Sequence, residues 1–143
     1  MPEKQTIERA RKDKREGKAP STQAGEFVRE EIEHIREGKH GARSTKQAIA
    51  IGLSKARRAG VKLPAPENAS KETKEQAKRD TRRAGKKKKS TKRSRATLQA
   101  LKREPRSTVS KKALSRQART AAKKRSKASR SRAAKKAAVT RKK

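Results

Sequence analysis

The C-terminal part of this chain carries too much charge to fold in isolation like an ordinary domain. Residues 81–143 contain 27 of the 47 Lys and Arg residues but a single acid, Glu104, so they hold 26 of the 33 net positive charges. Like charges at this density repel one another and oppose compaction until a polyanion neutralises them. We therefore expect residues 81–143 to form a long basic tail that is disordered or only conditionally helical.

Large apolar residues are too few for a sizeable core. Leu, Ile, Val and Phe make up 15 of the 143 residues, and ten of these lie between Ile7 and Leu63. A highly charged chain with less than about 20 % of such residues tends to be disordered. The expected fold class is mostly α, a small helical hairpin or three helices followed by the tail. Its parts are a frayed helix at 1–19, the hairpin at 20–63 and a linker at 64–80.

The first arm of the hairpin is predicted to be an acidic amphipathic helix over residues 21–38. Ser21 or Thr22 can cap its N-terminus, and Gly38 stands where a left-handed residue commonly ends a helix. Apolar residues recur at steps of three and four, which is the period of one helical face. The remaining positions are mostly acidic, namely Glu26, Glu30, Glu31, Glu33 and Glu37.

The second arm is predicted to begin at Ser44, which forms a capping box with Gln47, and to end at Gly60. Gly52 lies in a stripe of small residues, with an alanine four positions before and after it. Glycine inside a helix costs roughly 1 kcal/mol against alanine, so this stripe predicts a close helix–helix approach.

The short connection between these two helices predicts antiparallel neighbours. Antiparallel packing would bring Glu26 and Glu30 near the basic stretch 55–58, so that acids of one helix face bases of the other.

Residues typical of catalytic or metal sites are sparse. The chain has no Cys, which excludes thiolate zinc sites and Cys nucleophiles, and Phe27 is its only aromatic residue, which disfavours recognition by base stacking. Glu31 and His34 have the Glu-x-x-His spacing of helical di-iron sites, but such sites require the pair twice. His40 lies in a Gly-flanked loop without an evident partner. We expect no enzyme activity, cofactor or metal, and at most an auxiliary phosphate contact at the loop 38–41.

The tail predicts nucleic acid as the partner, because each phosphate neutralised by Lys or Arg releases condensed counterions. Such contacts position a protein on the phosphate backbone and read no base sequence. The expected contact residues are Lys86, Lys87, Lys88, Lys89, Lys92, Arg93, Arg95, Lys111, Lys112, Lys123, Lys124, Arg125, Lys135 and Lys136.

Residues 18–64, and most specifically the string STKQAIAIGLSKARRAG, resemble a bacterial family of small basic proteins of uncharacterised function. Some of its members are labelled plasmid stabilisation proteins. This resemblance implies a bacterial, cytoplasmic protein and supplies no catalytic residues. In composition, the tail is similar to the C-terminal tails of linker histones and to bacterial histone-like proteins.

Three functions fit these observations. The first is a nucleoid-associated protein whose tail binds DNA without sequence preference while its helical head docks or self-associates. The second is an RNA-binding or ribosome-associated protein. The third is an adaptor that uses the acidic helix 21–38 to bind a protein partner. Since no apolar run approaches membrane-spanning length, we expect no membrane partner and a cytoplasmic location at the nucleoid.

Overall fold

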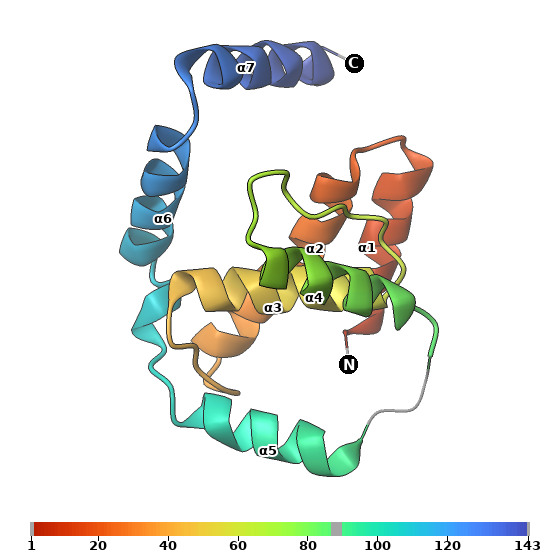
Figure 1. The fold of residues 1–143 in the computed structure, drawn as a ribbon, viewed down its shortest axis with the longest axis vertical. Coiled ribbons are helices and arrows are strands. Elements are labelled where there is room, and N and C mark those ends of the chain that lie inside the picture. The colour runs from red at the N-terminus through yellow and green to blue at the C-terminus, as the bar shows by residue number, and fades with distance from the viewer. Residues whose placement is uncertain (1, 87–89, 143) are drawn as a thin grey trace.

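The computed structural model describes residues 2–86 and 90–142, and these residues are predominantly helical (Figure 1). We call residues 2–86 the head and residues 90–142 the arm. The first four α-helices lie together in the head, and the last three follow an arc around it (Figure 1). In chain order the elements are α1 (Lys4–Arg15), α2 (Pro20–Arg36), α3 (Thr45–Arg58), α4 (Lys71–Arg82), α5 (Thr91–Lys102), the 3-10 helix η1 (Ser107–Val109), α6 (Lys111–Lys123) and α7 (Lys127–Arg141).

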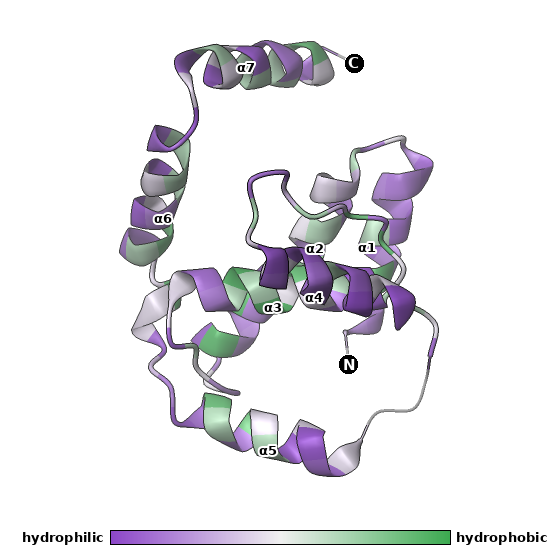
Figure 2. Ribbon diagram, in the orientation of Figure 1, coloured by the Kyte–Doolittle hydropathy of each residue, from purple (hydrophilic) through white to green (hydrophobic). Residues whose placement is uncertain are grey.

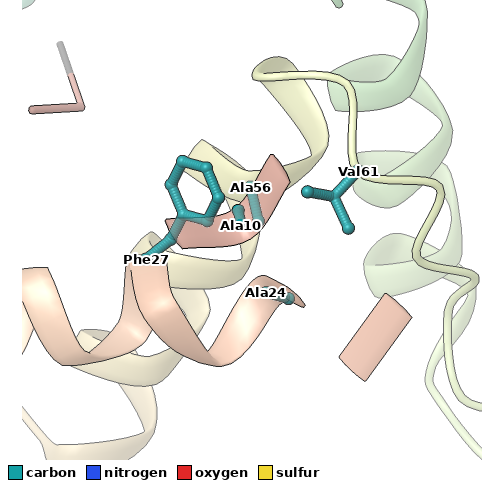
Figure 3. Packing of buried hydrophobic residues seen from close by; sticks show 5 residues of the cluster. All are labelled: Ala10, Ala24, Phe27, Ala56 and Val61. Carbon is teal, nitrogen blue, oxygen red and sulfur yellow. The ribbon is translucent and has the colours of Figure 1, made fainter. Parts of the chain in front are cut away.

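Helices α2 and α3 form the central pair of the head. Gly52 approaches Val28 so closely that a Cβ atom at Gly52 would lie 2.6 Å from the Val28 Cα atom. Nearby, Phe27 is 1 % exposed and belongs to one apolar cluster with Ala24 and Ala56 (Figure 3). Later positions on α2 meet earlier positions on α3, so the two helices are antiparallel. The small-residue stripe of α3 is the contact surface that its sequence predicts.

The N-terminus of α3 is capped at Ser44, whose Oγ accepts a hydrogen bond from the Gln47 backbone N–H at 3.1 Å. The Gln47 side-chain oxygen accepts a hydrogen bond from the Arg43 backbone N–H at 2.6 Å. In a capping box this second bond comes from the N–H of the cap residue itself, here Ser44. The predicted cap of α2 is wrong, because the helix begins at Pro20 without a side-chain cap. Proline suits the first helical position, since its fixed φ is already helical and its missing N–H would have no partner there.

Helix α4 occupies the second part of the predicted linker, and polar groups hold it against α3. Asp80 is 1 % exposed and accepts hydrogen bonds from Ser54 Oγ at 2.7 Å and Arg58 Nε at 3.0 Å, both on α3. Figure 2 shows α4 as almost wholly hydrophilic. A search for large apolar residues therefore misses this helix, because a buried carboxylate does the anchoring.

The prediction of a hairpin followed by a long tail that is disordered or only conditionally helical is wrong, because the arm is folded into helices. Three serines cap its α-helices, Ser90 before α5, Ser110 before α6 and Ser126 before α7. Each cap is worth about 1 kcal/mol, and Ala, Lys and Arg are strong helix formers. Repulsion between neighbouring like charges on a helix costs only about 0.2–0.5 kcal/mol per pair. We attribute the helices to these local preferences, which the total charge of the segment obscures.

Residue Val109 of η1 belongs to the core of the head, although it lies in the segment predicted to be a tail. It is fully buried in a cluster with Ile35, Ala42 and Ala48. Its carbonyl accepts two hydrogen bonds from the Arg36 guanidinium, at 3.2 and 3.3 Å. The arm is thereby fixed to the head at a point 73 residues from Arg36 along the chain.

Backbone hydrogen bonds extend this attachment along the α2–α3 connection. The Gly41 N–H donates to the Leu101 carbonyl at 2.8 Å, and the Ala42 N–H donates to the Pro105 carbonyl at 3.0 Å. A Cβ atom at Gly41 would lie 1.9 Å from the Glu104 carbonyl oxygen, so only glycine allows the approach. The Gly41 N–H is therefore occupied, which removes it from the phosphate contact predicted for the loop 38–41.

Candidate nucleic-acid interface

Four cations share one face of α6. The sequence spaces them at steps of four, three and four residues, which is the spacing of one helical face. A shallow surface hollow runs along this face, lined by Lys112, Ser115, Arg116, Arg119, Thr120 and Lys123. We call Lys112, Arg116, Arg119 and Lys123 the α6 stripe. All four side chains are exposed, so the stripe is available to an extended anion.

The predicted contact residues that the structure describes are all exposed, but they do not form one site. They lie at the end of the head, on α5, at both ends of α6 and on α7. Their positions are Lys86 after α4, Lys92, Arg93 and Arg95 on α5, Lys111, Lys112 and Lys123 on α6, Lys124 and Arg125 after it, and Lys135 and Lys136 on α7. Lys87, Lys88 and Lys89 lie outside the described residues.

The α6 stripe contains Arg116 and Arg119, which sequence reasoning overlooked. The prediction from the sequence rests on runs of adjacent bases, and adjacent residues on a helix point in different directions. The signal is nevertheless present in the sequence, because these four bases recur at the spacing of one helical face.

The cations of the arm helices lack acidic partners, whereas several cations of the head have them. Within the described residues, no Lys or Arg of α5, α6 or α7 forms an ion pair. In the head, by contrast, Lys18 contacts both Asp13 and Glu16 at 2.8 Å. Those two carboxylates raise the pKa of Lys18 well above its usual range, with Asp13 contributing the larger effect.

A buried polar cluster joins α2 to α3 and to the connection between them. Glu31 is 1 % exposed, and its Oε2 atom accepts a hydrogen bond from Lys55 Nζ at 2.5 Å. Its Oε1 atom lies 2.7 Å from His40 Nε2. The prediction that Glu26 and Glu30 face residues 55–58 is wrong in its partners, because Glu31 is the acid that reaches Lys55.

His40 is therefore part of the buried structure, whereas the sequence suggested a loop residue without a partner. It is 8 % exposed, and its Nδ1 atom lies 2.9 Å from the Gly41 carbonyl oxygen. No sequence signal indicates this position, since the loop is covered by residues far along the chain.

A second histidine lies beside this cluster at the N-terminal end of the head. His34 Nε2 lies 3.1 Å from Glu3 Oε1 and 3.6 Å from Glu30 Oε1. The hydrogen bond with His34 is the main reason that the pKa of the exposed Glu3 carboxyl is lowered, with Lys39 adding to the effect. These contacts tie the residue that precedes α1 to the C-terminal half of α2.

No helix among residues 2–86 and 90–142 combines the length and the apolar character needed to span a bilayer.

Residues 3–67 match the model of a family of unknown function (DUF6496). The match spans α1, α2 and α3 and ends before α4. No curated protein and no solved structure matches the chain. The expected resemblance to an uncharacterised family is thus confirmed for these residues, and the family's description includes neither the plasmid-stabilisation label nor a likeness to histone tails.

Proposed function

We propose that this protein binds nucleic acid without sequence preference, DNA in preference to RNA, and acts as a histone-like component of the bacterial nucleoid. The arm supplies the binding surface, and the head holds the arm in place through Val109. The observation that carries the proposal is the α6 stripe, four exposed cations on one face of a helix that contains no acid.

The distribution of charge favours a polyanionic partner. Surface charges that serve only solubility need not be concentrated at one end of a chain, yet residues 81–143 hold 26 of the 33 net charges. Lys and Arg on a helix face can follow a phosphate backbone, and each contact releases counterions. Base-specific recognition is not part of the proposal, because the described arm offers cations and small side chains and has no aromatic residue.

The alternative of an adaptor that binds proteins through an acidic α2 has less support. Of the five acids of residues 21–38, Glu30 and Glu31 are buried, and Glu26 is largely covered. Glu33 contacts Arg29 and Glu37 contacts Lys39 at 3.1 Å. Most of these acids are therefore buried or already paired with residues of the head, which leaves few of them for a protein partner.

The test keeps the full chain, since the arm contributes Val109 to the core. Replacing the four residues of the α6 stripe with Gln removes four charges and preserves a good helix former. If all four contact phosphates, the slope of log K against log salt becomes shallower by about 3.6. The affinity at 0.15 M salt then falls by about a thousandfold.

A matched control removes four exposed cations from α1, which are Lys4, Arg11, Lys14 and Arg15. The net charge changes equally in the two variants, so a general effect of charge predicts equal losses. We expect the α1 variant to bind duplex DNA nearly as tightly as the natural protein. Equal losses in both variants would contradict the proposed interface, and a stronger competition by structured RNA than by duplex DNA would favour the RNA alternative.

A further inference from the structure

Glu31, His34 and His40 bring three possible metal ligands together inside the head. One ligand atom from each residue lies within 4.8 Å of the other two. Glu31 and His34 come from one turn of α2, and His40 comes from the connection to α3. Two imidazoles and one carboxylate are a ligand set that binds Zn²⁺, with a fourth position left for water.

The carboxylate of this cluster is incompletely paired. Glu31 Oε1 is buried and has no aligned hydrogen-bond donor, although His40 Nε2 lies only 2.7 Å away. Two other buried carboxylate oxygens in the described residues share this condition, on Glu26 and Glu30, but only that of Glu31 lies in a cluster with two imidazoles. A buried polar atom without a partner calls for an explanation, and an ion is one of the usual ones.

The hydrogen bonds of His40 direct a lone pair at this oxygen. Its Nδ1 atom faces the Gly41 carbonyl, which can only accept, so Nδ1 must carry a hydrogen. A neutral His40 then has its lone pair on Nε2, opposite the Glu31 carboxylate. A cation between Nε2 and Oε1 would give both the lone pair and the carboxylate oxygen a partner. Histidines that bind metals usually donate their other N–H to a carboxylate or a backbone carbonyl, as His40 Nδ1 does here.

His34 has the same kind of outer support from a carboxylate. Its Nε2 atom lies 3.1 Å from Glu3 Oε1, so a neutral His34 donates there and keeps its lone pair on Nδ1. Carboxylate support of this kind orients the ring and makes the ligand more basic.

We propose that Glu31, His34 and His40 bind one divalent transition-metal ion of the Zn²⁺ class, which locks the α2–α3 connection where the arm attaches. Two ligands of one tetrahedral Zn²⁺ lie about 3.3 Å apart at Zn–ligand distances near 2.0 Å. The Glu31–His40 contact must therefore open by about half an ångström on binding. Lys55, bonded to the other Glu31 oxygen, weakens the site by repelling the ion.

The test measures zinc bound by the full-length protein after chelator treatment, incubation with ZnCl₂ and dialysis. Adventitious binding is disfavoured because the chain carries a net charge of +33. We expect one zinc per chain and a rise of about 5 °C in the melting temperature at a hundredfold excess over Kd. His40→Gln and, separately, His34→Gln should each weaken binding by about 100-fold or more, since loss of an outer partner alone costs 10–100-fold.

Two further variants separate a metal site from a purely structural cluster. Glu33→Gln removes an exposed carboxylate from the same helix and should leave zinc binding unchanged. Lys55→Met removes the competing ammonium, so zinc should bind more tightly and raise the melting temperature further than in the natural protein. Absence of stoichiometric zinc in the natural protein, or equal binding by the His34 and His40 variants, would overturn the proposal. Nucleic-acid binding does not enter this experiment, so its outcome is independent of the proposed function.

Discussion

The head and the arm are both rich in Lys and Arg, but they use these residues in opposite ways. In the head, several cations are matched to acids, as in the Lys55–Glu31 and Arg58–Asp80 pairs, and these two acids are buried. In the arm, the described helices carry their cations on exposed surfaces without acidic partners. The difference teaches that composition alone does not decide folding. Internal pairing lets a charged segment pack, and local helix preference lets another stay ordered while its charge remains available.

The largest expected effect concerns salt, and it should separate the two regions. If eight cations of the arm meet phosphates, the slope of log K against log salt for duplex DNA is about −7. Affinity should then fall on the order of ten-thousandfold between 50 and 200 mM salt. Electrophoretic shifts on two unrelated duplexes measure this, and the two duplexes should behave alike. A weak salt dependence or a large preference for one duplex would place the interaction outside the arm's phosphate contacts.

The close packing of the head can be tested with two identical substitutions. Gly52→Ala places a Cβ atom 2.6 Å from the Val28 Cα atom, which forces the helices apart. We expect a loss of about 1–3 kcal/mol in the free energy of unfolding. Gly25→Ala meets no atom within 4 Å, so it should gain up to about 1 kcal/mol from the better helix former. Urea denaturation of both variants gives the comparison, and equal effects would show that α2 and α3 do not meet at Gly52.

The attachment of the arm to the head can be tested at Val109. Val109→Ala removes buried methyl groups and should weaken the attachment by about 1–2 kcal/mol. Hydrogen exchange at the Gly41 and Ala42 amides, which bond to the Leu101 and Pro105 carbonyls, should become faster. Val139→Ala is the matched control, because Val139 is 60 % exposed and should change neither amide. Unchanged exchange in the Val109 variant would mean that the arm is held elsewhere.

The smallest effect expected is an acid-dependent one at Glu3. Its pKa lies below the usual 4.5 in the folded protein, mainly because of the hydrogen bond with His34. A carboxyl group whose pKa is lower in the folded protein than in the unfolded chain stabilises the folded state at pH values above the unfolded pKa. This contribution is lost as the pH falls through the folded pKa. Glu3 is exposed, so Glu3→Gln should lower the melting temperature only slightly at pH 7.

The natural protein and the Glu3→Gln variant also supply the pH test. The difference in melting temperature between the natural protein and Glu3→Gln should shrink as pH drops below 4.5. Glu8→Gln, an exposed change on α1, provides the baseline. A difference that persists unchanged at pH 3 would show that the Glu3 carboxylate does not form this contact.

The parts of the fold that the sequence predicts are those governed by local rules. Ser44 caps α3, Gly38 and Gly60 end α2 and α3 with positive φ, and Gly52 allows the helices to meet. Each of these follows from the residue type and its immediate neighbours. The antiparallel order of α2 and α3 follows from their short connection.

The parts that could not be predicted depend on contacts distant in sequence. Asp80 holds α4 against α3, and no apolar pattern in the sequence indicates this contact. Val109 joins the core cluster that contains Ala48 of α3, although the two residues are far apart in sequence. His40 is buried because residues 101–106 cover its loop. The prediction of disorder for the arm is wrong for a different reason. The serine caps and helix preferences of residues 90–142 determine their local structure more than their total charge does.

The position of Val109 also affects how the chain can fold and be divided. Helices α2 and α3 are close in sequence and can pair early, whereas the cluster around Ile35, Ala42 and Ala48 is completed only when a distant segment arrives, after a large loop has closed. The family match stops at residue 67, so the unit matched by sequence is smaller than the unit that completes this core. A protein shortened to the matched region would expose an apolar hollow at the α2–α3 connection, and it would need a substitute for one valine.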